Sequence, residues 1–150
     1  MQKTLVLLKP DAIQRGLVGE IVSRLEARGL KIVGMKLMKV SRVLAQRHYA
    51  EHEGKPFFGG LVDFITSGPI IAMAMEGNDA ITLVRHTMGA TSPLDSDAGT
   101  IRGDLAVEIG RNLVHGSDSP ESADRELALF FTEDELLSYV RDTDIWITGS

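Results

Sequence analysis

The amino-acid sequence predicts an α+β fold of the ferredoxin-like (split β-α-β) type, a sandwich in which helices cover an antiparallel four-stranded sheet. Two observations carry this prediction. Segments with apolar residues at helical spacing separate short aliphatic runs, and the elements follow in the order strand, helix, strand, helices, strand, helix, strand. A doubly wound parallel sheet is the alternative, but the chain has too few strong strand segments for it. No linker divides the 150 residues, so a single domain over 1–150 is expected.

The first part of the chain reads as strand, helix, strand. The apolar run Thr4 to Leu8 stops at Lys9-Pro10 and predicts a buried strand. Apolar residues then follow at the spacing of one helix face, and Gly29 suits the left-handed residue that ends such a helix. Lys31–Val40 is rich in Ile, Val, Leu and Met and is expected to be the second strand. The residues of the helix face are Val18, Ile21, Val22 and Leu25.

The middle of the chain predicts two helices and a strand. A short helix is expected at Leu44–Glu53, where Gly54 and Pro56 stop it. Helical spacing then returns and ends at Gly68-Pro69, and Ile70–Met75 is expected to be the third strand. The apolar residues of the second helix are Phe58, Leu61, Val62 and Ile65.

The last part of the chain contains the expected fourth strand. Asn78 is the expected cap of a helix, and the stretch 89–103 reads as a loop because Gly, Pro, Ser, Thr and Asp recur throughout it. Asn112–His115 is a short strand-like piece, and Ser119-Pro120 is typical of a helix start. A final helix over Glu133–Tyr139 and an extended tail are expected. Apolar residues assigned to these helices and the core are Ile81, Val84, Met88, Leu127, Leu129, Phe130 and Phe131.

The composition excludes several classes of protein. A net charge of -5 and a pI of about 5.3 argue against a surface built to bind a nucleic-acid backbone, although a few positive groups can still dominate one cleft. The chain has no cysteine, so it has no disulfide and no thiolate metal site. No segment approaches the length of a membrane span, and a cytoplasmic protein is expected. The phosphate-binding patterns GxxxxGK[ST] and GxGxxG are both absent.

One pattern suggests metal chemistry. The run His48-Tyr49-Ala50-Glu51-His52 matches HxxEH, a signature of zinc peptidases in which two histidines share a helix face and the glutamate acts as a base. The expected helix stops almost at once at Gly54 and Pro56, and a third protein ligand would have to come from elsewhere. We therefore favour the alternative, a polar and partly exposed helix end.

The segment from Asn112 to Ser122 carries the clearest chemistry. A short apolar strand brings His115 to its end, Gly116 permits a sharp turn and a close approach, and the following helix N-terminus favours anions. A neutral imidazole can act as a covalent nucleophile, and phosphoryl transfer otherwise needs positioning and neutralisation of charge. Glu126 lies in the following helix, where it can fold back to orient the ring. From spacing alone, a structural histidine at a strand end remains the preferred interpretation.

Basic residues that could bind phosphate are spread along the chain. Arg102 lies in the run Gly99–Asp104, where glycines let the backbone and the guanidinium approach a phosphate together. Lys9 and Arg85 are further candidates. Each also has an ordinary structural explanation, since Lys9 ends a strand and Arg85 lies on a helix face.

The chain resembles nucleoside diphosphate kinases over nearly its whole length, and the similar runs follow one another in the family's order. The last of them resembles the family's phosphohistidine motif, NxxHGSD, which is highly specific. The runs are Lys9-Pro10-Asp11, Gln14-Arg15-Gly16, His48-Tyr49, Pro56-Phe57-Phe58, Ser67-Gly68-Pro69, Gly99 to Asp104, and Asn112 to Ser119.

The resemblance implies a ping-pong reaction. A nucleoside triphosphate phosphorylates His115, the diphosphate leaves, and a second nucleoside diphosphate takes the phosphoryl group. Ser117 and Glu126 match residues that support the histidine. Residues that match groups around the phosphates are Lys9, Tyr49, His52, Arg85, Thr91 and Arg102.

The resemblance also implies how the rest of the nucleotide binds. Lys9 and Asn112 match groups that contact the ribose, Phe57 matches an aromatic residue that stacks on the base, and Ile109 stands where a branched aliphatic residue covers the opposite face. Stacking tolerates every base, which suits a broad range of nucleoside di- and triphosphates, ATP and GDP among them. Mg²⁺ is the implied cofactor, carried mainly by the nucleotide phosphates rather than by a protein metal site.

Some features depart from the family pattern. Ala12 stands where the family often has glycine, and the stretch Ser92 to Ala98 and the tail from Asp142 look individual. Both of these regions help to form subunit contacts in relatives, so the resemblance implies a homo-oligomer, with a hexamer favoured over a tetramer. A non-catalytic nucleotide-binding module on the same fold is the alternative function. The presence of His115 together with the basic residues argues against it.

Overall fold

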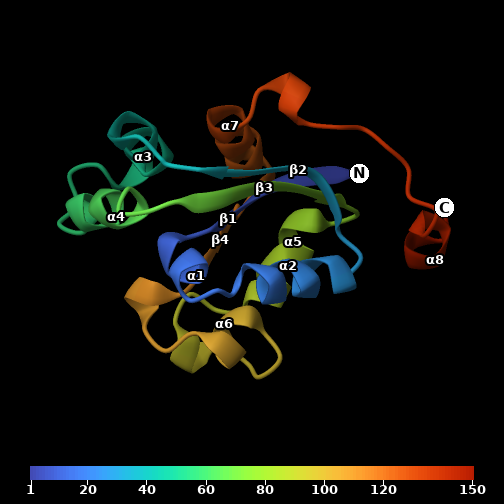
Figure 1. Cartoon of the computed structure of the whole chain (residues 1–150), viewed down its shortest axis with the longest axis horizontal. Coiled ribbons are helices and arrows are strands. Elements are labelled where there is room, and N and C mark those ends of the chain that lie inside the picture. The colour runs from blue at the N-terminus through green and yellow to red at the C-terminus, as the bar shows by residue number, and fades with distance from the viewer.

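Alternation along the first strand explains why the protein has two cores. In β1 (Gln2–Leu8) the side chains of Leu5 and Leu7 point to one face of the sheet, whereas Val6 and Leu8 point to the other. The structure is a computed structural model that describes all residues, 1–150, and β1 lies inside its sheet (Figure 1). Helices are therefore required on both faces of the sheet to keep these apolar side chains from water.

The sheet has four strands and is antiparallel throughout. The other strands are β2 (Lys31–Met38), β3 (Ile70–Gly77) and β4 (Val114–Gly116), and the order across the sheet is β2-β3-β1-β4. The two inner strands, β1 and β3, are paired along their whole length. This order, with α2 (Val18–Ala27) lying between β1 and β2 in the chain and α5 (Ala80–Met88) between β3 and β4, is the split β-α-β arrangement, so the predicted fold class is confirmed.

Helices cover each face of the sheet with an apolar side. The face that carries Val6 packs against α2 (Val18–Ala27) and α5 (Ala80–Met88). The opposite face packs against three helices, as Figure 1 shows. These helices are α3 (Arg42–His48), α4 (Phe58–Ile65) and α7 (Pro120–Phe130).

Several predicted helices have the expected signals at their ends. Gly29 follows α2 with φ +97°, the left-handed conformation predicted for it. Ser119 caps α7, because its hydroxyl accepts a bond from the N–H of Ser122 at 3.1 Å, and Pro120 is the first helical residue. The helical spacing from Phe58 to Ile65 corresponds to α4.

Other boundaries differ from the prediction. Asp79, not Asn78, is the residue before α5, and it adopts φ +53° without a side-chain capping bond. The expected helix Leu44–Glu53 is α3 followed by the short 3₁₀ helix η1 (Ala50–His52). The stretch 89–103 is not wholly loop, and the connection after β1 contains an unpredicted helix. The additional elements are α1 (Pro10–Gln14), η2 (Pro93–Asp95), α6 (Ile101–Leu105) and η3 (Ile109–Arg111).

The C-terminal region is where the prediction is wrong. The expected helix Glu133–Tyr139 is only the 3₁₀ turn η4 (Glu133–Glu135), and the tail ends in the helix α8 (Asp144–Thr148) instead of being extended. Between them the chain runs along β2, where Leu137 N–H donates to the carbonyl of Val33 at 2.8 Å. Contacts of this kind with a distant strand satisfy backbone groups that a helix would otherwise pair internally. Figure 1 shows this segment leading away from α7 to α8.

The helices are short. None of them combines the length and the apolar character that crossing a lipid bilayer requires.

Candidate active site

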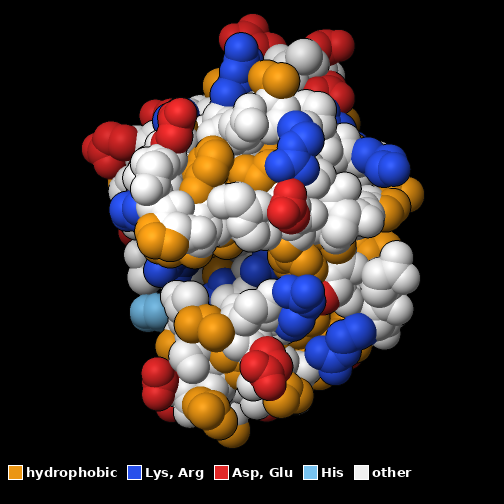
Figure 2. Space-filling model, turned by 90° about the vertical axis from the view of Figure 1, so that its left-hand side faces the viewer, with side chains coloured by type: hydrophobic (Ala, Val, Ile, Leu, Met, Phe, Trp, Pro, Cys, Tyr) orange, Lys and Arg blue, Asp and Glu red, His pale blue; other side chains and the backbone are white.

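A hollow crosses the face of the molecule on the α4 side, and positively charged side chains lie inside it (Figure 2). The site residues predicted from the sequence come from elements around this region. They lie on β1 and its end, α3 to α4, α5, the stretch 89–102, η3, β4 and α7. The sheet order places β4 beside β1, so His115 and Lys9 come from neighbouring strands despite their distance in sequence.

His115 lies in β4 and is held by a carboxylate from α7. Its Nε2 is 2.6 Å from Glu126 Oε1, and the Ser117 hydroxyl donates to the same carboxylate oxygen at 3.1 Å. The Ser117 oxygen in turn accepts a bond from the N–H of Leu5 in β1 at 3.3 Å. Glu126 of α7, itself held by the Ser117 hydroxyl, therefore fixes the plane of the His115 imidazole, and the His115 side chain stays partly exposed.

The Glu126 carboxylate is ionised in this arrangement. Burial works to raise its pKa, but the hydrogen bond and charge of His115 and the Ser117 hydroxyl outweigh burial, so the pKa of Glu126 lies below its ordinary value. An ionised carboxylate accepts hydrogen bonds and cannot donate them. The proton between the two groups is therefore assigned to Nε2 of His115, which leaves Nδ1 with its lone pair.

His48 is buried and packs against His115. Its ring meets that of His115 edge-to-face with centroids 4.8 Å apart, and it also packs against Tyr49 at 4.7 Å and Phe130 at 5.4 Å. Burial is the main cause that lowers the pKa of His48 to about 3, and the neighbouring His115 adds to it. His48 is therefore neutral at every pH at which enzymes commonly work.

The two histidines of the HxxEH pattern have different surroundings. His48 faces His115, and one ligand atom from each of His48, His115 and Glu126 lies within 4.8 Å of the others. His52 lies in η1, where its Nε2 is 3.6 Å from Glu51 and its ring packs against Phe57 with centroids 5.2 Å apart. The shared helix face that a zinc-peptidase motif needs is lost, because the α-helix ends at His48.

Arg102 is buried, and backbone carbonyls occupy much of its guanidinium. Its Nε donates to Asn112 O at 3.2 Å, Nη1 to Gly89 O at 3.1 Å and Nη2 to Val114 O at 2.7 Å. Burial and the nearby charge of Arg85 lower its pKa to about 10, so Arg102 keeps its charge at neutral pH. The adjacent Gly103 serves packing, since a Cβ there would lie 2.0 Å from the carbonyl oxygen of Asp97. That the glycines on either side of Arg102 let a phosphate approach stays a prediction, and Gly103 has this packing role beside it.

Lys9 and Asn112 form a second pair beside the site. The Lys9 ammonium donates to the Asn112 side-chain oxygen, and the Asn112 amide donates to the carbonyl of Thr91 at 2.9 Å. Burial lowers the pKa of Lys9 to about 8; Asp11 opposes this, while Arg102 and Arg111 reinforce it. The structure thus joins three of the predicted nucleotide-binding residues.

Arg85 approaches the nucleophile's strand from α5. Its Nη1 donates to the carbonyl of Gly116 at 3.3 Å, which leaves most of its N–H groups free. Gly116 lies inside β4, where no turn occurs, and a Cβ there would be 2.8 Å from Met88 Sδ and 3.0 Å from Val84 Cγ1. The expected turn at Gly116 is therefore absent, and the glycine instead allows α5 to pack closely against β4.

The candidates for contact with the base lie at the outer end of the site. Phe57 precedes α4 and is 51% exposed, and Ile109 begins η3 and is 60% exposed, so both offer free apolar surface. Tyr49 is more deeply placed, and burial together with the charge of Glu126 raises its pKa to about 12. Its hydroxyl is therefore protonated and able to donate at neutral pH.

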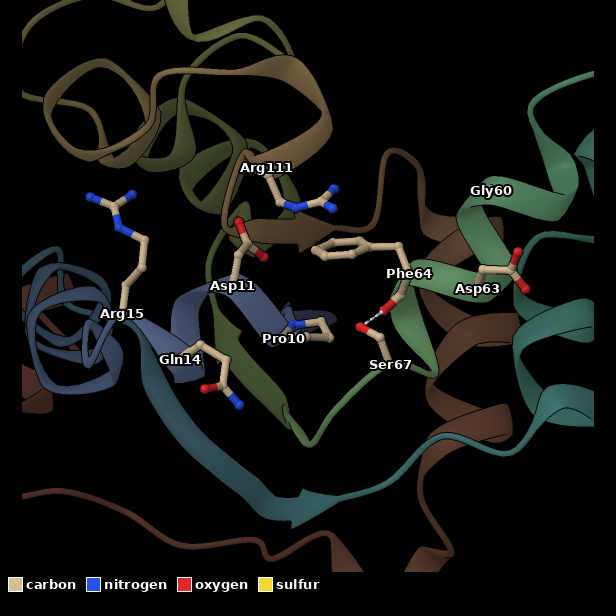
Figure 3. Close-up of a pocket in the computed structure, with 9 residues that line it drawn as sticks. All are labelled: Pro10, Asp11, Gln14, Arg15, Gly60, Asp63, Phe64, Ser67 and Arg111. Atoms are coloured by element: carbon tan, nitrogen blue, oxygen red, sulfur yellow. Dashed lines mark hydrogen bonds between the residues drawn. The ribbon is translucent and has the colours of Figure 1, made fainter.

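A cavity of about 680 Å³ lies between α1, α4 and Arg111, and none of the predicted site residues lines it. Figure 3 shows the Arg111 side chain reaching across toward Phe64 of α4, and the guanidinium carbon lies 4.1 Å from the ring centroid. Lys9 approaches the same ring at 5.9 Å. The cavity therefore adjoins the candidate site on the far side of the Arg111–Phe64 contact.

The sequence interpretation missed residues that act inside the site. For His48 the sequence suggests a metal ligand and membership of the family-like run His48-Tyr49, whereas the residue packs against the ring of His115. Asp11, buried in α1, was noted only as part of a family-like run, although its carboxylate reaches Leu113 N at 3.0 Å. The Lys9-Pro10-Asp11 run is the only signal for Asp11. The spacing of Phe64 and Arg111 gives none, because they meet only in the tertiary structure.

Comparisons with known proteins give one consistent result. The family model described as nucleoside diphosphate kinase matches residues 2–136. A nucleoside diphosphate kinase of Carboxydothermus hydrogenoformans is 60% identical over 147 residues, covering 98% of this chain and 99% of that protein. The nucleoside diphosphate kinase of Thermomicrobium roseum is also 60% identical, over 99% of this chain and 100% of that protein.

Solved structures agree in fold and in sequence. A halophilic nucleoside diphosphate kinase from Halobacterium salinarum, solved in complex with CDP, superposes with a TM-score of 0.95 at 55% identity over 97% of both chains. A nucleoside diphosphate kinase family protein from Babesia bovis gives a TM-score of 0.96 at 46% identity, covering 98% of this chain and 99% of that one. The chain belongs to the nucleoside diphosphate kinase family.

Proposed function

We propose that this nucleoside diphosphate kinase moves the γ-phosphoryl group of a nucleoside triphosphate to a nucleoside diphosphate through Nδ1 of His115. The observation that carries the proposal is the 2.6 Å contact between His115 Nε2 and the ionised Glu126 carboxylate. Because Nε2 is occupied by the proton of this bond, Nδ1 is the nitrogen with a free lone pair.

The reaction then has two steps that mirror each other. Nδ1 of His115 attacks the γ-phosphorus, the bond to the bridging β,γ-oxygen breaks, and the nucleoside diphosphate leaves with that electron pair. A terminal phosphate oxygen of the second diphosphate attacks the same phosphorus, and the bond to Nδ1 breaks. Glu126 offsets the positive charge that develops on the ring in the phosphorylated state, and it keeps its hydrogen bond throughout.

Positive groups around His115 suit the charge of a triphosphate. Lys9 uses one of its three N–H donors on Asn112, Arg85 uses one of its five on Gly116, and Arg102 uses three of its five on carbonyls. The remaining donors are available to phosphate oxygens. Arg102 also ties its own helix to the strand that bears the nucleophile. Preorganised donors of this kind supply much of the stabilisation in phosphoryl transfer.

The nucleoside binds by stacking and by contacts to the sugar. We propose that the base lies between Phe57 and Ile109, which are both exposed, and that Lys9 and Asn112 contact the ribose. Tyr49, His52 and Thr91 complete the phosphate side. A base held by its faces can be any base, so the range of substrates is expected to be broad. The CDP bound to the Halobacterium salinarum relative agrees with a pyrimidine as one of them.

Mg²⁺ is the proposed cofactor and accompanies the nucleotide. The residues proposed to face the phosphates, Lys9, Arg85 and Arg102, are cationic, which does not suit a protein metal cage, so phosphate oxygens and water would supply most of the ion's ligands. Asp118 provides a fitting oxygen donor. It is exposed, and its charge interacts with both Arg85 and His115. Bound in this way, Mg²⁺ supplies neutralisation of phosphate charge.

We also propose a homo-oligomer, with a hexamer favoured over a tetramer. Large apolar side chains are exposed at separate places on the single chain. Leu94 lies in the stretch 89–100, Leu37 on β2, and Trp146 in α8. Contiguous exposed apolar surface marks subunit interfaces, and α8 offers it, because Ile145 and Ile147 beside Trp146 are exposed as well.

The test is phosphoryl transfer from ATP labelled at the γ-phosphate, with Mg²⁺, first to the protein alone and then to added GDP. Wild type is expected to take up an acid-labile label and to pass it on, and His115→Ala is expected to do neither. His86→Ala, which removes an exposed histidine of α5 that is not among the proposed site residues, is the control and should be labelled normally.

Two results would contradict the proposal in different ways. Wild type that binds nucleotide but takes up no label would identify a non-catalytic binding module on this fold. A His115→Ala variant that still takes up label would mean that another residue is the nucleophile.

A further inference from the structure

Leu113, two residues before His115, has an unusual backbone. Its φ is +75°, in the left-handed region that a residue with a branched side chain seldom adopts. The N–H of Val114 donates to the carbonyl of Asn112 across it at 2.9 Å. A bond from residue i+2 back to residue i with this φ describes a γ-turn of the rare, strained kind. The Leu113 side chain is fully buried, so the turn is locked into the core.

Groups from α1 hold both sides of this turn. The Asp11 carboxylate oxygen Oδ2 accepts the N–H of Leu113 at 3.0 Å, and the N–H of Lys9 donates to the carbonyl of Leu113 at 2.9 Å. Asp11 is buried, and its bond to Leu113 is to a backbone amide that the γ-turn leaves without another partner. Figure 3 shows the Asp11 carboxylate rising from α1 toward the segment that carries Arg111, just ahead of this turn.

The residues on either side of the turn belong to the proposed reaction. Asn112 precedes the turn, and its side-chain oxygen accepts a hydrogen bond from the Lys9 ammonium. Val114 follows the turn and leads directly to His115. Arg102 donates to the carbonyls of both Asn112 and Val114. A change of backbone direction at Leu113 would move Asn112, Arg102 and the start of β4 relative to one another.

We propose that Asp11 is a positioning residue of the phosphoryl-transfer site, whose carboxylate holds the strained γ-turn at Leu113 and thereby places Asn112 and His115 for reaction. The inference rests on the proposed function of His115. Strained backbone persists where the surroundings over-determine it, and it concentrates at functional sites. Here the two bonds from Asp11 and Lys9 are the contacts that over-determine it.

The first experiment compares Asp11→Ala with Asp11→Asn in the full chain. Asparagine keeps a side-chain oxygen that can accept the Leu113 N–H, whereas alanine leaves this buried N–H without a partner. The readout is the rate of His115 phosphorylation by γ-labelled ATP at saturating nucleotide, with nucleotide affinity measured separately. We expect Asp11→Ala to lose about 10- to 100-fold in this rate, and Asp11→Asn to stay within a few-fold of wild type.

The second experiment tests the turn itself. Glycine adopts φ +75° without strain, whereas alanine does not, and both remove the same leucine side chain. We therefore compare Asp11→Ala/Leu113→Gly with Asp11→Ala/Leu113→Ala. The glycine double variant is expected to phosphorylate His115 faster than the alanine double variant. If Asp11→Ala does not fold, as judged by far-UV circular dichroism, Leu113→Gly and Leu113→Ala are compared alone, with the same expectation.

The outcomes separate this inference from the proposed function. Wild type that takes up no label would remove the proposed function and this inference together. Wild type that is labelled, with Asp11→Ala labelled at the same rate, would overturn only the role of Asp11. The same conclusion follows if Asp11→Asn is as slow as Asp11→Ala, or if glycine at position 113 gives no advantage over alanine.

Discussion

At the scale of single residues, the proposed contact of Lys9 with phosphate predicts a pH dependence of nucleotide capture. Burial lowers its pKa to about 8, against an ordinary value of 10.5. The ammonium is therefore charged at neutral pH but loses its proton as the pH rises through about 8 in the free enzyme. A bound phosphate would favour the charged form, so the effect belongs to the step in which the nucleotide is captured.

We expect kcat/KM to fall above about pH 8 in the wild type, and the fall in kcat to begin at higher pH. In Lys9→Arg the guanidinium stays charged, so the variant is expected to be less active, because the contact with Asn112 is lost, but to have a flatter profile between pH 7.5 and about 9. Steady-state kinetics across this range provide the measurement. An identical alkaline fall in both proteins would assign it to another group.

His48 makes a prediction about stability rather than rate. Its pKa is about 3 in the folded chain and about 6.5 when unfolded, so between these values the unfolded state binds the extra proton. Acidification below pH 6.5 therefore destabilises the fold. When the pH falls from 7 to 5, the unfolding free energy of wild type should drop by about 2 kcal/mol more than that of His48→Phe. Urea unfolding at fixed protein concentration measures this, and the exposed His86→Phe variant should behave like wild type.

At the scale of elements, α6 and the preceding loop depend on one close contact. The Gly103 position has room for hydrogen only, because a Cβ would overlap the carbonyl of Asp97 and also lie 2.7 Å from Thr100 Oγ1. Thr100 caps α6 by accepting the N–H of Gly103 at 3.0 Å. The loop also supplies the carbonyls of Gly89 and Thr91 to Arg102 and Asn112.

Gly103→Ala is therefore expected to push the loop away from α6. We expect a loss of about 1–3 kcal/mol in unfolding free energy together with weaker nucleotide binding. Gly19→Ala in α2 is the matched control, since a Cβ there meets nothing within 4 Å and alanine favours a helix. Thermal unfolding and nucleotide titration of both variants decide the point. Equal behaviour of the two variants would contradict it.

Local sequence patterns predicted the helices whose apolar residues repeat over two turns or more, which are α2, α4, α5 and α7. The four strands were predicted from short aliphatic runs. The five-residue helices α1, α6 and α8 escaped prediction because they are too short to show a period. The segment Glu133–Tyr139 has helix-forming residues, yet contacts with β2 override that propensity. Tertiary contacts of this kind are invisible to a reading of local pattern.

The contacts in the candidate site also fall into those that the sequence could predict and those that only the tertiary structure reveals. Position in the chain suggested that Glu126 reaches back to His115, because one helix follows the strand directly. It could not reveal that Arg102 binds three backbone carbonyls, because every residue has a carbonyl and the sequence carries no signal for such a contact. Nor could it reveal that His48 packs against His115, since these two residues are far apart in sequence. Only the resemblance to a family gathered Lys9, Phe57 and Asn112 into one site before the structure was known.

At the scale of the whole molecule, the C-terminal segment is anchored inside the chain yet ends in exposed apolar surface. The Lys31 ammonium is buried and donates to Tyr139 O at 2.6 Å, and Arg141 donates to the carbonyls of Gly29 and Leu30. Beyond this anchor, Trp146 of α8 is 88% exposed. A fixed segment that presents a bare tryptophan is well suited to contact another subunit.

Trp146→Ser is expected to weaken assembly while leaving the fold of the single chain intact, because the indole makes little contact within it. Sedimentation velocity over a range of concentrations should show smaller species than wild type. Val107→Ser, which removes an equally exposed apolar side chain from another part of the surface, is the control and should assemble normally. Unchanged assembly of Trp146→Ser would place the interface elsewhere.

The central place of β1 in the sheet also governs when activity first exists during synthesis. Its partners are β3 and β4, and 103 residues separate Lys9 from Asn112. At about 5–20 residues per second, a ribosome needs roughly 5–20 seconds to make that stretch. Both edges of β1 stay unpaired until β3 has been made, and the edge that pairs with β4 stays unpaired until residues 114–116 follow. The catalytic centre is therefore among the last parts of the protein to form, and a truncated translation product that ends before residue 112 has no route to activity.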